Sequence, residues 1–144
     1  MSDHAQLTTV RVERVLAAPP HEVYDAWLDE AELAEFICPA GVAEVAIDPR
    51  VGGRIRISMI YPDRRHEIEG AYISLDRPER ISFSWHSSSS AAGSVVTVTF
   101  ATHGVGETLM TIVHSQLAPD ISHLFDAGWK VVGQQLAAAL ASII

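Results

Sequence analysis

Apolar and polar positions alternate along most of the middle of the chain. Between residues 54 and 61, apolar side chains at positions 55, 57, 59 and 61 alternate with Arg54, Arg56 and Ser58. A period of two is typical of a strand with one buried face. Similar runs, bounded by turn residues, predict further strands over residues 7–16, 42–47, 66–75, 81–86, 95–102 and 108–115. Their regular spacing predicts an antiparallel meander.

Helical spacing marks three other segments. Pro20 suits the first turn of a short helix over residues 21–28. Asp29 and Glu32 form a capping box for a second short helix, which Pro39 ends. From Pro119 toward Ile143, apolar residues recur every three or four positions and predict a long helix with one buried stripe. The stripe consists of Ile121, Phe125, Trp129, Val132, Leu136 and Leu140.

Two glycines, Gly128 and Gly133, interrupt this long helix. Each costs about 1 kcal/mol relative to alanine inside a helix. Glycine at such a position usually indicates that another backbone or a ligand comes close. We expect the sheet to approach the helix most closely at Gly128 and Trp129, so that the helix forms the floor of a pocket.

Size and charge narrow the class of protein. The 144 residues suit a single domain over 1–144, and this length needs no disulfide or metal to fold. Ten basic against 18 acidic residues give a net charge of −8, which argues against nucleic acid and anionic membranes as partners. A lone cysteine, Cys38, favours a reducing compartment. With no signal-peptide pattern and no long apolar run, we expect a cytoplasmic protein.

Six short motifs follow one another along nearly the whole chain. They are Pro20-x-x-Val23-Tyr24-x-Ala26-Trp27, Arg50-Val51-Gly52-Gly53-Arg54-Ile55-Arg56-Ile57, Gly70-x-Tyr72, Arg77-Pro78-Glu79-Arg80-Ile81-x-Phe83-x-Trp85, Thr108-x-Met110-x-Ile112-x-His114 and Gly128-Trp129. In this order they resemble the activator-of-heat-shock-protein-90-ATPase homologues of the START-like (SRPBCC) superfamily. Family members often carry an aromatic pair where this chain has Phe36-Ile37.

The resemblance implies an α+β helix-grip fold, like that of START and birch-pollen-allergen proteins. Such a fold has a curved antiparallel sheet of about six to seven strands, two short helices, and a long C-terminal helix over the concave face. It also implies a deep cavity between the sheet and the final helix, closed at one end by the short helices.

Aromatic and sulfur-containing side chains, together with one histidine, are the candidate cavity lining, with plain core packing as the alternative for each. They are Trp27, Phe36, Met59, Tyr61, Tyr72, Phe83, Trp85, His114, Phe125 and Trp129. His114 shares strand parity with Met110 and Ile112, so it should point inward with them. It is either a polar anchor or proton-transfer group at the cavity, or a core histidine with its hydrogen bonds satisfied.

Other reactive side chains form no convincing set. His123 and Asp126 lie one helical turn apart but have no third ligand. His66 lies beside Glu67 and Glu69, whose neighbouring arginines favour an ion-pair face, and both groups are interpreted as solvated surface. Cys38 has no base near it in sequence and is interpreted as a structural thiol. We therefore predict no catalytic residues, no metal and no cofactor.

Three functions stay open at this stage. The leading hypothesis is the binding of a small hydrophobic or amphipathic ligand in the central cavity. The first alternative is an enzyme of the cyclase, hydrolase or isomerase type that uses His114 as general acid or base. The second, suggested by the family resemblance, is regulation of a chaperone ATPase. Homodimerisation is left open.

Overall fold

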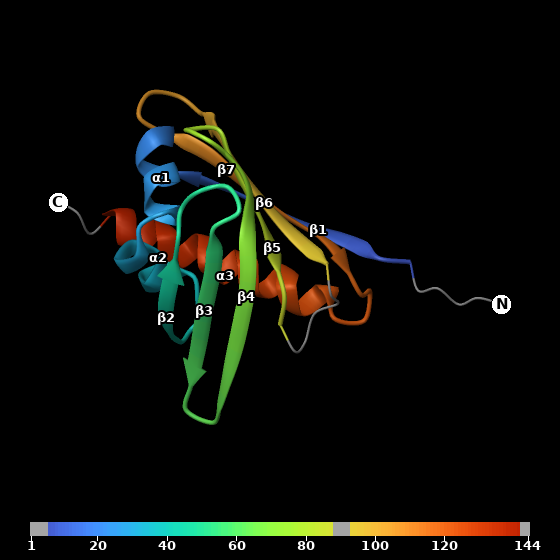
Figure 1. Ribbon diagram of the computed structural model, residues 1–144. Helices are drawn as coiled ribbons and strands as arrows, with labels where there is room; N and C mark the ends of the chain where they lie inside the picture. Colours follow the sequence, from blue (N-terminus) through green and yellow to red (C-terminus); the bar gives the residue numbers. More distant parts are fainter. Residues whose placement is uncertain (1–5, 88–92, 142–144) are drawn as a thin grey trace.

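The computed structural model describes residues 6–87 and 93–141 of the chain (Figure 1). Its elements follow the predicted order of one strand, two short helices, six strands and a long helix. They are β1 (Thr8–Leu16), α1 (Pro20–Trp27), α2 (Glu30–Phe36), β2 (Val42–Ile47), β3 (Arg54–Tyr61), β4 (Arg64–Asp76), β5 (Arg80–Trp85), β6 (Ser94–Thr102), β7 (Thr108–Leu117) and α3 (Ser122–Ala141).

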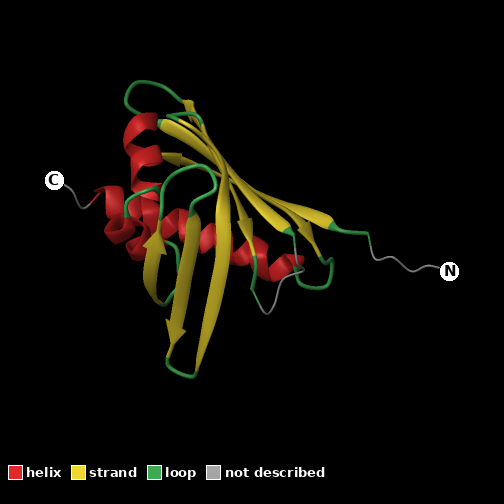
Figure 2. Cartoon of the chain, in the orientation of Figure 1, coloured by secondary structure: helices red, strands yellow, loops and turns green. Residues whose placement is uncertain are grey.

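All strands join one seven-stranded antiparallel sheet in the order β1-β7-β6-β5-β4-β3-β2, which wraps around α3 (Figure 2). The strands from β2 to β7 form the predicted meander, and β1 closes the order by pairing with β7. The predicted α+β helix-grip fold is confirmed. None of the described helices is long and apolar enough to cross a membrane.

The two short helices form as their end residues predict. Pro20 opens α1, and the Asp29 side chain caps α2 by accepting a hydrogen bond from the Glu32 backbone N–H at 3.0 Å. From α1, Asp25 accepts two hydrogen bonds from the Arg77 guanidinium, at 2.9 and 2.8 Å. Those bonds lower the pKa of Asp25 and fasten α1 to the turn between β4 and β5.

Two glycines lie where a side chain would not fit. A Cβ on Gly53 would collide with the carbonyl oxygen of Asp48, and one on Gly70 with that of Ser84. Close to Gly70, the pairing of β4 with β5 shifts register between Tyr72 and Ser74. Such irregularities bend and twist a strand, which helps the sheet to curve around α3.

Some element ends differ from those predicted. The long helix begins at Ser122 instead of Pro119, because residues 118–121 form a turn in which the Ile121 N–H donates to the Ala118 carbonyl at 3.2 Å. The predicted end at 143 lies outside the described residues. β4 begins at Arg64 instead of His66, since Tyr61 and Arg64 pair directly across a tight turn.

The helix α3 packs mainly against β1, β7 and α2. We call the region of β1, β6 and β7, with α1 and the C-terminal half of α3, the packed half. Its inward side chains are buried and include Val12, Val98, Phe100, Met110 and Ile112. We call the region of β3, β4 and the first three turns of α3 the hollow half, because a cavity lies there between the helix and part of the inward face of the two strands.

Candidate functional site

A cavity of about 740 Å³ lies between the concave face of β3 and β4 and the first three turns of α3. Its volume is within the range of roughly 300–1,000 Å³ that is usual for small-molecule sites. The sheet side is formed by Met59, Tyr61, His66 and Ile68, and Trp85 joins them from the end of β5. Most of the lining is apolar, and no carboxylate occurs among its described members.

The first turns of α3 and the residue just before them form the opposite wall, with small and aliphatic side chains as well as aromatic ones. Ile121 precedes the helix, and the helix residues are Leu124, Phe125, Ala127, Gly128, Trp129, Val131 and Val132. At Gly128 an added Cβ would make only an ordinary contact with Pro39, at 3.6 Å. At Gly133 it would lie 3.2 Å from the Arg14 side chain on β1. The prediction of closest sheet approach at Gly128 is therefore wrong, and the sheet comes nearer at Gly133.

The predicted lining residues occupy three positions relative to this cavity. Met59, Tyr61, Trp85, Phe125 and Trp129 line it. Trp27, Tyr72 and Phe83 border a separate void of about 10 Å³, about the size of one water probe. Phe36 and His114 are buried and border neither space.

An aromatic layer separates the cavity from the core beneath it. Ring contacts connect every predicted lining residue except Met59 and Tyr61 into one set. Trp85 stands at its centre, with edge-on contacts to Trp129 at 5.4 Å and Phe125 at 6.3 Å between ring centroids. Because each ring packs against others, the layer forms a firm floor for the cavity.

His114 lies on the core side of this layer and is fully buried. The Trp129 indole N–H donates to its Nδ1 at 3.1 Å, so the neutral ring carries its proton on Nε2. Nε2 lies 3.2 Å from Oγ of Ser94, which donates to the Trp85 carbonyl at 2.6 Å. Burial lowers the pKa of His114 from 6.5 to about 4, so the ring is neutral near pH 7. Both nitrogens are engaged, and neither is available to a molecule in the cavity.

One end of the cavity is closed by the segment that follows α2. The Gln135 amide of α3 donates to the carbonyls of Phe36 and Cys38, at 2.9 and 3.0 Å, and accepts from the Ala40 N–H at 2.9 Å. The Tyr61 hydroxyl donates to the Pro39 carbonyl at 2.9 Å. Burial, with the adjacent Cys38 thiol, raises the pKa of Tyr61 to about 12. Hydrogen bonds from α3 and from β3 thus both fix the position of this end wall.

The mouth lies where exposed residues of α3 and of the β3–β4 hairpin border the cavity. Leu124 is 59% exposed there, and the Arg64 side chain is 53% exposed. The Arg64 guanidinium stacks on the Tyr61 ring at 4.4 Å, and its Nε donates to Nε2 of His66 at 3.2 Å. Its Nη1 donates to Asp63 at 3.0 Å. The mouth therefore combines an apolar side with a positioned cation.

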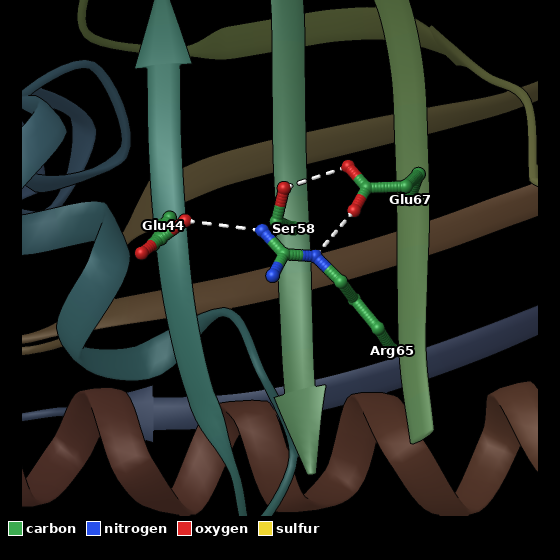
Figure 3. A network of polar contacts seen from close by, with 4 residues as sticks. All are labelled: Glu44, Ser58, Arg65 and Glu67. Carbon is green, nitrogen blue, oxygen red and sulfur yellow. Dashed lines mark hydrogen bonds and ion pairs between the residues drawn. The ribbon is translucent and has the colours of Figure 1, made fainter.

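A polar network covers the other face of the same strands (Figure 3). Arg65 donates to Glu67 at 2.7 Å and to Glu44 at 3.2 Å, and the Ser58 hydroxyl donates to Glu67 at 2.7 Å. These contacts connect β2, β3 and β4 through side chains that alternate with the cavity-facing ones. They support the strand register that directs Met59 toward the cavity.

Sequence reasoning missed several members of the site. His66 and Ile68 alternate on the same strand face, and this parity could have identified them. Leu124 and Val131 follow helical spacing beside the predicted stripe, so a wider stripe would have included them. Arg64 lies at a tight turn and carried no signal in the pattern.

The residues considered for metal binding do not gather into a ligand set. Within residues 6–87 and 93–141, no group of three or more His, Cys, Asp or Glu side chains could hold a metal ion. His66 contacts Arg64, and Asp126 pairs with Lys130 at 2.9 Å. The Cys38 thiol is buried.

Comparisons with known proteins agree with this architecture. The family model described as Activator of Hsp90 ATPase homolog 1-like protein matches residues 17–141. The crystal structure of CV1439 from Chromobacterium violaceum is 33% identical, with a TM-score of 0.82 over 90% of this chain and 95% of that one.

More distant structures share the fold. Ms6760 from Mycobacterium smegmatis is 22% identical, with a TM-score of 0.78 over 96% of this chain and 98% of its own. CalU16 from Micromonospora echinospora is 17% identical, with a TM-score of 0.70 over 95% of this chain and 86% of its own. No protein of curated function matches the chain.

Proposed function

The chain belongs to the Activator of Hsp90 ATPase homolog 1-like family, and from this premise we propose that it binds a small hydrophobic or amphipathic molecule in its central cavity. The observation that carries the proposal is the cavity of about 740 Å³ with its mostly apolar wall. A wall of this kind favours apolar ligands because binding removes their surface from water. The family is known for ligand binding in such a cavity.

The packing around the cavity indicates that the space stays open in solution and does not collapse. The floor is an interlocked aromatic layer, and the end wall is fixed by Gln135 and Tyr61. For the hollow half to collapse, these hydrogen bonds and ring contacts would have to break. A preformed site lowers the conformational cost of binding.

A cavity-filling variant tests the proposal. The neutral fluorescent probe N-phenyl-1-naphthylamine should bind the wild-type protein, and apolar compounds should raise its melting temperature. Gly128→Leu extends a side chain from the cavity wall and should weaken probe binding by about tenfold or more, since it displaces the ligand. Ala138→Leu, at an exposed position of the same helix, is the matched control and should leave binding unchanged. Absence of probe binding to the wild-type protein, or equal binding by both variants, would contradict the proposal.

The geometry gives less support to the two other functions. Enzymatic use of His114 would require the ring to leave its bonds to Trp129 and Ser94 and to pass the aromatic layer. Chaperone regulation has only the family description in its favour, and a pull-down with Hsp90 tests it directly. The proposal takes the protein to be cytoplasmic, on the sequence argument from its lone cysteine.

A further inference from the structure

The charged groups at the cavity mouth are unevenly distributed. Arg64 is the one Lys or Arg among the described lining residues, and none of these residues is acidic. This arrangement contrasts with the whole chain, whose net charge is −8. At physiological ionic strength, charges beyond about 8 Å are largely screened. What the mouth attracts therefore depends on Arg64 and on the Asp63 carboxylate paired with it at 3.0 Å, and not on the charge of the whole chain.

Neighbouring side chains hold the Arg64 guanidinium in place. Its stacking on the Tyr61 ring and its bond to His66 fix the plane of the group beside the opening. An arginine has five N–H donors in a planar fork, which suits a carboxylate. The described contacts use the Nε and Nη1 atoms, with Nη1 donating to Asp63.

The bond to Asp63 is one that a ligand could replace. The Asp63 side chain is 75% exposed, and such surface ion pairs contribute little. A carboxylate delivered from the cavity side would meet Arg64 in partly apolar surroundings, where charge-assisted bonds are stronger. A single guanidinium matches one negative charge, which favours a carboxylate over a doubly charged phosphate.

Building on the proposed function, we infer that the ligand is a carboxylate amphiphile whose apolar body fills the cavity and whose carboxylate binds Arg64 at the mouth. Leu124 lies at the same opening and offers an apolar surface to the segment that joins the two parts. The ligand would therefore lie with its tail toward the aromatic layer and its charged end at the β3–β4 hairpin.

The test compares two ligands of equal chain length, decanoate and 1-decanol, by displacement of N-phenyl-1-naphthylamine at low salt and neutral pH. Arg64→Gln should raise the dissociation constant of decanoate about fivefold and that of 1-decanol less than about twofold. Arg50→Gln removes the same charge from an exposed turn, where Arg50 pairs with Asp48 as Arg64 pairs with Asp63. This control should affect neither ligand.

The outcomes separate this inference from the proposed function. If Arg64→Gln weakens the binding of both ligands equally, or if both variants weaken the binding of decanoate equally, the carboxylate assignment is overturned. The proposal of cavity binding then still stands. If neither the probe nor 1-decanol binds the wild-type protein, the proposed function itself fails. Unchanged melting temperatures and circular dichroism in both variants would show that the substitutions act on binding and not on folding.

Discussion

Ile112 on β7 and Ile68 on β4 point toward the concave face of the same sheet, yet they have different neighbours. Ile112 is 0% exposed and lies between Val98 and Val12 on the adjacent strands, within the packed half. Ile68 is 3% exposed and borders the cavity of the hollow half. Burial alone does not distinguish the two positions, because neighbouring side chains cover nearly all of Ile68 even though it borders the cavity.

The path of α3 creates the difference. The helix packs on β1 and β7 and on the end of α2, where Gln135 binds the segment after α2. Its first turns stand away from β3 and β4, and the space between them is the cavity. A sheet with uniform alternation can therefore be solid on one side and hollow on the other, depending on where one helix makes its contacts.

Matched truncations of these two isoleucines should show the largest effect. Ile112→Ala leaves a new void among close-packed side chains and should lower the free energy of unfolding by about 4 kcal/mol. Ile68→Ala enlarges an existing cavity and loses fewer contacts, so about 2 kcal/mol is expected. Urea denaturation of both variants measures the difference. Equal losses would mean that the hollow half is packed in solution.

The pH dependence of stability tests whether the aromatic layer keeps water from His114. The pKa of His114 is lowered to about 4 by burial, while its unfolded value is 6.5, so the unfolded chain binds more protons between these values. The stabilisation is complete above pH 6.5, decreases as the pH falls from 6.5, and is almost fully lost once the pH has fallen through 4. From pH 7 to 4, the wild-type protein should lose about 3 kcal/mol more than His114→Leu.

The subtraction isolates this one group, because the six other histidines of the seven occur in both proteins. A difference that stays constant with pH would show that water reaches the ring. The hydrogen bonds of His114 with Trp129 and Ser94 would then lie within reach of the cavity, and the enzymatic alternative would regain support.

Alanine substitutions of the two helix glycines should show the smallest difference in stability. Gly128→Ala should stabilise the protein by about 1 kcal/mol, since alanine favours helix and its Cβ meets nothing closer than Pro39 at 3.6 Å. Gly133→Ala should gain nothing, because its Cβ would lie 3.2 Å from the Arg14 side chain. Thermal unfolding compares them. Equal gains would remove this evidence that the helix is close to the sheet at one position and distant at the other.

The fold could be predicted because its signals are local. Alternation fixes each strand, Asp29 and Pro20 mark the short helices, and apolar spacing marks α3. The cavity wall is another matter. Ile68 and Ile112 have the same pattern, and only the long-range contacts of α3 decide which of them meets empty space. No periodicity carries that information.

The prediction of site residues leaned toward large aromatic side chains, whereas space is made by small ones. Phe36 and Phe83 fill the core, while Gly128 and Ala127 border the cavity. The inward direction of His114 followed correctly from strand parity, but its partners did not, since Ser94 and Trp129 are 20 and 15 residues away.

Gly128 and Gln135 are seven residues apart on one continuous helix, about two turns. One belongs to the wall of the cavity and the other holds its end. Inserting or deleting a single residue between them would rotate one by about 100° relative to the other, so that the wall or the anchor would face the wrong way. The dimensions of this pocket can therefore evolve by substitution of side chains. An insertion or deletion between Gly128 and Gln135 would instead disrupt the pocket.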